Sequence, residues 1–185
     1  MAEYYLVSQL PSLDGIGDNV PLPITEERFL ELCHRFLGKK ACNELDRLSL
    51  TPTKEYNKSN SALIESWNNG ERTLRLALAK IRAEKMKKSF DTENINFPPA
   101  LMQTARTATE TDSPMEAEKF LNHYRLKFLE SLRPSDTFSE DYIFYYYLEL
   151  KLLLRIRQFD TDKGQEAYRN IYNSIINGDA LEVVQ

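Results

Sequence analysis

Several small groups of residues have types that could bind a metal ion, and each departs from the spacing that the ion needs. Cys33, His34 and Cys42 offer zinc ligands, but their separation is not a usual zinc-ligand spacing. The run 160–164 resembles the start of a calcium-binding loop. Its glycine comes one position early, and Ile171 stands where the bidentate glutamate of such a loop belongs. The sequence therefore predicts no metal site.

Nucleotide-binding and nucleophile motifs are also missing from the sequence. Gly15 and Gly17 could begin a dinucleotide fingerprint, but that fingerprint needs a third glycine where Val20 stands. Neither a phosphate-binding Gly-x-x-x-x-Gly-Lys-Ser/Thr loop nor a Gly-x-Ser-x-Gly elbow is present. Paired carboxylates stand at predicted helix starts, where the helix dipole explains them: Glu116 with Glu118, and Glu140 with Asp141. We therefore expect no catalytic residue, no cofactor and no small-molecule substrate, and predict that the chain is not an enzyme.

Three arginines on one predicted helix are the most informative charged residues. At 100° per residue, Arg72, Arg75 and Arg82 fall on one stripe of a helix predicted from about 61 to 88. The interval 71–88 carries a net charge of +5 in a chain whose net charge is −4. The stripe is either a solvated or internally paired face, or a docking face for an acidic partner, because arginine forms bidentate bonds with carboxylates. These three arginines are the candidate partner-binding residues.

Composition and hydropathy limit the classes of protein that the chain can be. Of its 185 residues, 42% are hydrophobic and 28% charged, as in globular proteins. The net negative charge makes nucleic acid an unexpected partner. The most apolar stretch, 142–156, contains Glu149, Lys151 and Arg155, so it is no membrane span. The N-terminus lacks a secretory signal and only two cysteines are present, so we expect a cytoplasmic protein.

Helical patterns cover most of the chain. The aromatic and β-branched run 3–10 is the exception, and it predicts a strand or an extended arm. Helices are expected at 25–37, 39–48, 61–88, weakly within 100–110, from Ser113 to just before Pro134, from Ser139 onward, and finally up to Asn177. The fold class is mostly α, a helical bundle with a short extended N-terminal arm or strand. We expect one domain over 1–185, with 1–95 and 110–185 as candidate sub-lobes joined by a polar linker.

A run of tyrosines marks the most apolar of these helices. Tyr142, Tyr145, Tyr146 and Tyr147 could form a platform on which nucleic-acid bases stack, but such platforms are exposed and flanked by cations. Here the aromatic residues occupy consecutive positions of a helix that is apolar nearly all round. The pattern therefore favours a role in the core.

Three stretches of the sequence together resemble a known family. They are Tyr4-Tyr5-Leu6-Val7-Ser8 with Leu10-Pro11, Trp67-x-x-x-Glu71-Arg72-x-Leu74-Arg75 with Ile81-Arg82, and Tyr147-x-x-x-Leu150-Lys151 with Arg155-x-x-x-Phe159-Asp160. The chain resembles, from residue 4 to about 176, the uncharacterised bacterial family encoded in V-type ATPase operons. That family looks like a counterpart of the funnel-shaped helical component of V/A-type ATPases that sits on the membrane rotor ring and receives the foot of the central shaft.

The resemblance implies an all-helical, non-catalytic coupling piece between the central stalk and the membrane rotor. The implied partners are the central-stalk and membrane-ring subunits of a V/A-type ATPase, which would place the protein peripherally on the cytoplasmic face of the membrane, in contact with it only through those partners. Arg72, Arg75 and Arg82 would then contact an acidic part of the stalk or ring. The alternative is a stand-alone helical adaptor that binds an acidic protein or a nucleic acid through the basic helix 71–88.

Overall fold

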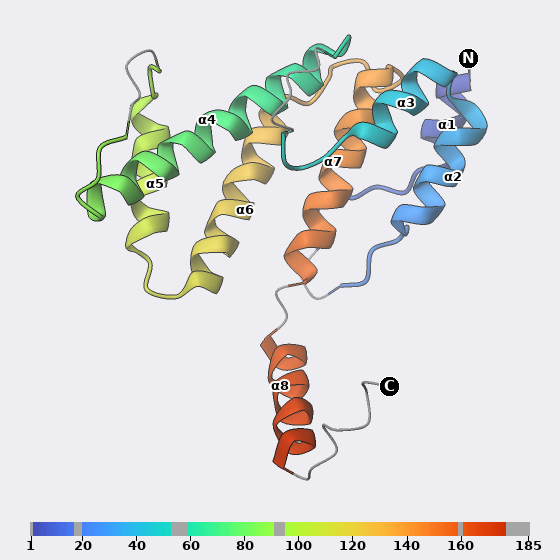
Figure 1. Cartoon of the computed structure of the whole chain (residues 1–185). Helices are drawn as coiled ribbons and strands as arrows, with labels where there is room; N and C mark the ends of the chain where they lie inside the picture. The colour runs from blue at the N-terminus through green and yellow to red at the C-terminus, as the bar shows by residue number, and fades with distance from the viewer. Residues whose placement is uncertain (1, 17–19, 53–58, 91–94, 159–160, 177–185) are drawn as a thin grey trace, which may run out of the picture.

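The computed structural model describes residues 2–16, 20–52, 59–90, 95–158 and 161–176. Within these ranges the chain forms eight helices and no strand (Figure 1). The helices are α1 (Ala2–Gln9), α2 (Glu26–Phe36), α3 (Lys39–Arg47), α4 (Ala62–Lys85), α5 (Pro99–Glu110), α6 (Pro114–Ser131), α7 (Glu140–Arg157) and α8 (Thr161–Ile176). The predicted mostly α bundle is confirmed.

Local capping signals set the starts of four of these helices. Thr25, Ser61, Ser113 and Ser139 precede α2, α4, α6 and α7, and each side-chain oxygen accepts a hydrogen bond from the backbone N–H three residues later. Such caps satisfy one of the backbone donors that a helix start leaves unpaired. Because these signals lie in the adjacent sequence, the predicted starts agree with the observed ones.

The N-terminal segment is a helix, so the predicted strand or extended arm is wrong. Residues Ala2–Gln9 form α1, which packs against α2. Leu6 is fully buried, while Val7 and Leu10 pack partly buried against the same core. These three positions are spaced i, i+1 and i+4, which places them on one face of a helix, whereas a strand would point Leu6 and Val7 to opposite sides. The aromatic residues that suggested a strand, Tyr4 and Tyr5, lie exposed.

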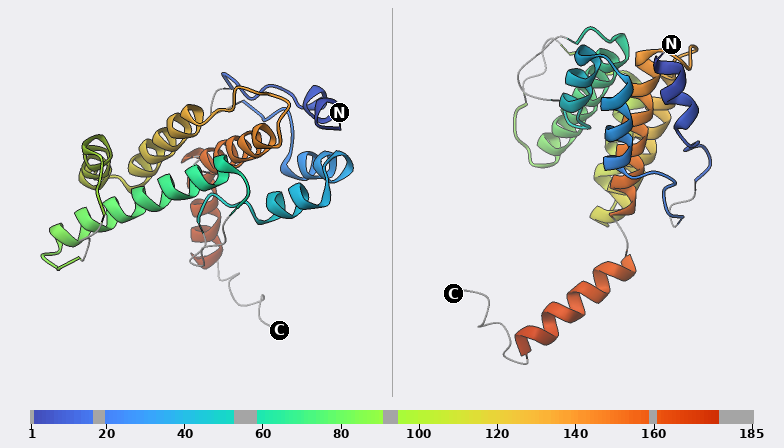
Figure 2. Two further views of the ribbon diagram at one scale, coloured as in Figure 1. Left: turned by 90° about the horizontal axis from the view of Figure 1, so that it is seen from above. Right: turned by 90° about the vertical axis from the view of Figure 1, so that its right-hand side faces the viewer.

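Two apolar cores lie along the long helix α4, which runs across the bundle (Figures 1 and 2). The larger core joins α1, α2, α3 and α7 to the first turns of α4 and the last turns of α6. The smaller core joins the second half of α4 to α5 and the start of α6. Since α4 and α6 contribute to both cores, they connect the two parts of the bundle. The sub-lobes expected at 1–95 and 110–185 stay a prediction.

The tyrosine-rich helix α7 forms the centre of the larger core. Tyr145, Tyr146 and Tyr147 are buried, and the ring of Phe29 stacks on the last two at centroid distances of 5.4 and 5.1 Å. The hydroxyl of Tyr146 donates to the carbonyl of Pro11, and that of Tyr147 donates to Glu26, each at 2.8 Å. The predicted core role is confirmed. None of the described helices has the length and apolar character needed to cross a membrane.

Candidate functional site

The predicted arginine stripe of α4 divides into residues with different surroundings. Arg75 is 45% exposed, and its Nε donates to Glu71 Oε1 at 2.8 Å while its Nη2 donates to Thr51 Oγ1 at 3.0 Å. Arg72 is half-buried and its Nη1 lies 3.5 Å from Asn69 Oδ1. Arg82 is exposed in the last turn of α4. The internally paired interpretation therefore applies to Arg75, and a role in partner binding stays a prediction for all three.

Glu71, the acid that holds Arg75, is nearly inaccessible to solvent. Its side chain is 2% exposed and accepts two further hydrogen bonds from Arg125, from Nε at 3.0 Å and from Nη2 at 3.1 Å. This bidentate geometry matches the planar guanidinium to the carboxylate. A buried pair of this kind joins α4 to α6 at one defined position along both helices.

The same guanidinium extends the ion-pair network to α7. Arg125 Nη1 donates to Asn122 Oδ1 at 3.0 Å and to Glu118 Oε1 at 3.3 Å. Glu118 also accepts from Arg155, whose Nη2 lies 2.6 Å away. We call the chain of alternating charges Arg75, Glu71, Arg125, Glu118 and Arg155 the ion-pair network. It ties α4, α6 and α7 together beneath the surface, where exchange with water is limited.

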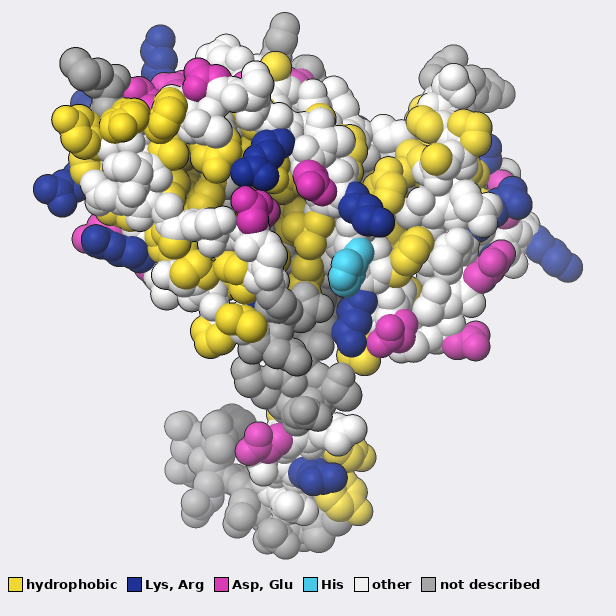
Figure 3. Space-filling model, turned by 180° about the vertical axis from the view of Figure 1, so that it is seen from behind, with side chains coloured by type: hydrophobic (Ala, Val, Ile, Leu, Met, Phe, Trp, Pro, Cys, Tyr) yellow, Lys and Arg dark blue, Asp and Glu magenta, His cyan; other side chains and the backbone are white. Residues whose placement is uncertain are grey.

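Helix α8 carries the largest exposed apolar side chains of the described residues outside the bundle. Tyr168, Ile171, Tyr172 and Ile175 are between 52% and 68% exposed. Their spacing of i, i+3, i+4 and i+7 places them on one face, which we call the α8 face. Figure 1 shows α8 standing clear of the other helices, and Figure 3 shows hydrophobic side chains gathered on one side of it. An apolar face of this size outside a core is typical of a surface that binds a partner.

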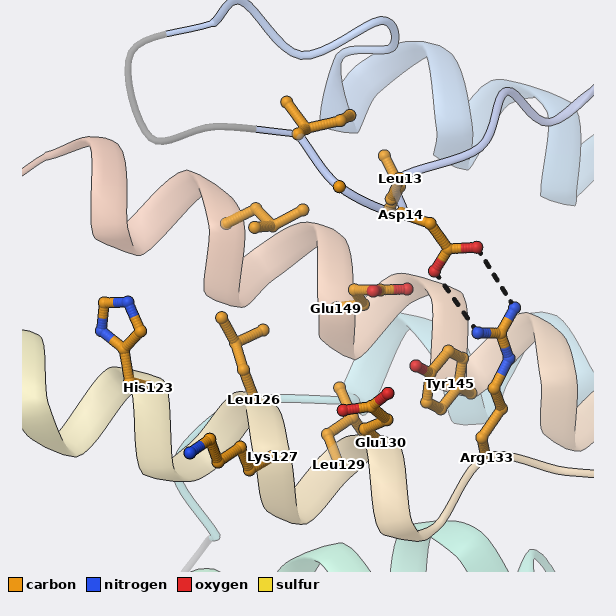
Figure 4. A pocket seen from close by; sticks show the side chains of 13 residues that line it. Leu13, Asp14, His123, Leu126, Lys127, Leu129, Glu130, Arg133, Tyr145 and Glu149 are labelled. Carbon is orange, nitrogen blue, oxygen red and sulfur yellow. Dashed lines mark hydrogen bonds and ion pairs between the residues drawn. The ribbon is translucent and has the colours of Figure 1, made fainter.

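A cavity of about 280 Å³ lies between the segment 13–16, α6 and α7 (Figure 4). At its rim Arg133 donates to both carboxylate oxygens of Asp14, at 3.3 and 3.5 Å. Glu149 points into the same space from α7. Burial raises the pKa of Glu149 to about 7, and the negative charges of Asp14 and Glu130 raise it too, while Arg133 opposes them.

The raised pKa of Glu149 predicts a specific dependence of stability on pH. In the unfolded chain the group ionises near its ordinary value of 4.5, and in the folded chain near 7. The folded state therefore binds more protons between these values, so the free energy of unfolding falls as pH rises from 4.5 to 7 and the loss is complete above it. We expect Glu149→Gln to be more stable than the wild type at pH 8 by about 1–2 kcal/mol, and no more stable at pH 4.5.

Urea unfolding at both pH values measures this difference. The control is Glu130→Gln, which removes an exposed carboxylate of the same cavity and is expected to change the pH dependence much less. Equal pH dependences of the wild type and Glu149→Gln would contradict the prediction.

The other groups that sequence analysis considered for chemistry lie apart from these features. Cys33 and Cys42 are buried thiols, and burial, followed by the neighbouring Cys42, raises the pKa of Cys33 to about 12. His34 lies on the exposed side of α2, with Nε2 3.1 Å from Asp46. No group of three or more potential ligands among the described residues is placed to hold a metal ion. Asp160, in the run that resembles a calcium loop, and Gly17 lie outside the described residues.

Sequence analysis did not identify Glu118 or Arg125 as members of a network, and it did not single out the α8 face. The helical periodicity of Tyr168, Ile171, Tyr172 and Ile175 was a usable signal for an amphipathic helix. The same periodicity describes a helix packed on a core, so the pattern alone does not reveal that the face is exposed.

Comparison with known proteins gives one match. A family described as "Protein of unknown function (DUF2764)" matches residues 98–179, a range that contains α5, α6, α7 and α8. No curated protein and no solved structure matches the chain. The matched family carries no assigned function, and the resemblance to a family of V-type ATPase operons stays a prediction. The chain is thus similar, over its C-terminal helices, to a family whose function is not known.

Proposed function

We propose that this chain is a non-catalytic docking protein that joins a larger assembly through the α8 face. The observation that carries the proposal is the exposure of four large apolar side chains on one side of a helix that stands apart from the bundle. Complete burial of a side chain of this size contributes about 1.5–3 kcal/mol. Burial of the α8 face by a partner would therefore supply several kcal/mol toward association, before the entropic cost of binding is subtracted.

The partner that we propose is a V/A-type ATPase, with the chain acting as a coupling piece between its central stalk and its membrane ring. The resemblance of residues 4–13, 67–83 and 138–164 to the ATPase-operon family supports this choice. A coupling piece transmits force by its shape and needs rigid helices rather than catalytic groups. The ion-pair network across α4, α6 and α7 is compatible with such rigidity. Its location would be peripheral, on the cytoplasmic face, with Arg72, Arg75 and Arg82 as a second contact.

The test is co-purification of the full chain with the ATPase central-stalk and ring subunits of the same organism. We expect those subunits to be recovered with the wild type. Ile171→Asp combined with Ile175→Asp should reduce recovery by about tenfold or more, because it places two charges in the apolar contact. The matched control is Asn170→Asp with Asn173→Asp, which adds the same charges at exposed polar positions of the same helix.

Two results would overturn the proposal. Equal loss in the control pair would show that charge or helix stability, and not the α8 face, determines recovery. Absence of ATPase subunits from the wild-type purification, when they are present in the extract, would exclude the ATPase as partner and leave the stand-alone adaptor.

A further inference from the structure

A second cavity, of about 290 Å³, lies on the side of α7 that faces residues 48–51. We call it the basic pocket. Its lining residues come from the start of α2, the segment after α3 and the last turns of α7: Glu26, Ser49, Leu50, Thr51, Lys151, Leu154, Arg155 and Gln158. These segments lie about a hundred residues apart in sequence, and the fold brings them together.

The cations of the basic pocket are held in place and still have donors to offer. Lys151 Nζ donates to the carbonyl of Leu48 at 3.0 Å and lies 3.6 Å from Glu26 Oε1. An ammonium has three N–H donors, so one remains. Arg155 uses Nε and Nη2 on Glu118, which leaves its Nη1 outside those bonds. Fixed cations with remaining donors are pre-organised to receive an anion.

The hydroxyl groups of the pocket are also oriented as donors. Thr51 Oγ1 accepts a hydrogen bond from Arg75 Nη2 at 3.0 Å, and Ser49 Oγ accepts one from the backbone N–H of Thr51 at 3.2 Å. A hydroxyl that already accepts a hydrogen bond keeps its own O–H for an acceptor. The pocket therefore presents hydroxyl and cationic donors together.

The charge balance of the ion-pair network gives the pocket a surplus of one positive charge. Three guanidinium groups, of Arg75, Arg125 and Arg155, share the two carboxylates of Glu71 and Glu118. Arg125 is the buried middle member, and the two end members reach the pocket, Arg155 by lining it and Arg75 through Thr51. The remaining charged residues of the lining, Lys151 and Glu26, compensate each other. One unbalanced cation at a half-buried pocket favours one anion.

We propose that the basic pocket binds one carboxylate, supplied by an acidic side chain of the docked partner protein. A single carboxylate neutralises the single surplus charge, whereas a phosphate group, at about −1.5 to −2 charges near pH 7, would leave excess negative charge. Leu50 and Leu154 offer apolar contact to the methylene groups of such a side chain. This inference rests on the proposed function, and it adds Lys151, Arg155, Thr51 and Ser49 to Arg75 as the residues that recognise the partner.

The first experiment titrates the isotope-labelled full chain with butyrate, a single carboxylate on a short apolar chain, and follows the backbone amides of Thr51 and Gln158 by NMR. We expect saturable shifts at both amides that sodium chloride at equal ionic strength does not produce. Gln158→Glu keeps the shape of the side chain and adds a negative charge at the pocket, so it should weaken butyrate binding roughly fivefold. Gln158→Lys is the matched control and should bind butyrate at least as well as the wild type.

Absence of saturable shifts would overturn the proposal. Tighter binding of inorganic phosphate than of butyrate would overturn the carboxylate in favour of a phosphate group. In the co-purification assay, Gln158→Glu should lower recovery of the ATPase subunits and Gln158→Lys should not; equal recovery in both would show that the pocket takes no partner carboxylate. If the wild type binds butyrate but recovers none of the ATPase subunits, the proposed partner fails while the carboxylate specificity of the pocket stands.

Discussion

Replacing Glu71 by alanine is expected to lower the free energy of unfolding by about 3–5 kcal/mol. The side chain is 2% exposed and accepts hydrogen bonds from both Arg75 and Arg125. Arg75 can turn toward water when its partner is removed, because it is 45% exposed. Arg125 is only 9% exposed, so its guanidinium stays buried without the carboxylate that compensated its desolvation. The unpaired cation, more than the lost bonds, accounts for the size of the effect.

Urea unfolding of three variants tests this explanation. Glu84→Ala removes an exposed acid of the same helix and should change the free energy of unfolding by less than about 0.5 kcal/mol. Glu71→Leu combined with Arg125→Met removes both charges and should be clearly more stable than Glu71→Ala, because apolar groups can replace a buried ion pair. A double variant as unstable as Glu71→Ala would contradict the unpaired cation as the cause.

The helices could be predicted from the sequence because the signals that start and end them are local. A capping hydroxyl such as that of Ser113, with proline at the first helical position, acts on backbone groups within one turn. The N-terminal helix α1 was predicted wrongly for a related reason. Eight residues provide too few periods to separate helix from strand by pattern, and packing of Leu6 against the larger core decides between them.

The candidate sites could be predicted only in part, because they depend on contacts between distant segments. Arg75 and Glu71 are four residues apart on one helix, so their pairing can be read from the sequence. The bonds from Arg125 to Glu71 join positions 54 residues apart, and no local signal marks them. The same is true of Lys151, which meets the carbonyl of Leu48 across 103 residues. The sequence therefore identified Arg75 as notable without revealing the network and the pocket beside it.

Replacing Gly70 by leucine is the second change for which we expect a large effect, a loss of about 3 kcal/mol in the free energy of unfolding. Gly70 lies where α4 passes the ring of Phe128 on α6, and even a Cβ at this position would overlap Phe128 Cε1 and Cζ. The ring is half-buried and stacks on Trp67, with centroids 6.1 Å apart. It must therefore leave the stack to make room. Gly70→Ala should cost less, about 1–2 kcal/mol, because alanine is the better helix former.

Thermal and urea unfolding measure both losses, and Gly164→Ala is the matched control. Gly164 also lies within a helix, α8, but a Cβ there meets no atom within 4 Å. We expect that change to leave the bundle as stable as the wild type. Phe128→Ala in the Gly70→Leu background removes the overlapping ring and lets the leucine occupy its place, so it should restore part of the lost stability. A double variant whose loss equals the sum of the two single losses would show that the close contact with Phe128 is not what requires glycine. Restoration would instead establish that Trp67, Gly70 and Phe128 together set how closely α4 approaches α6, and hence whether Glu71 can reach Arg125.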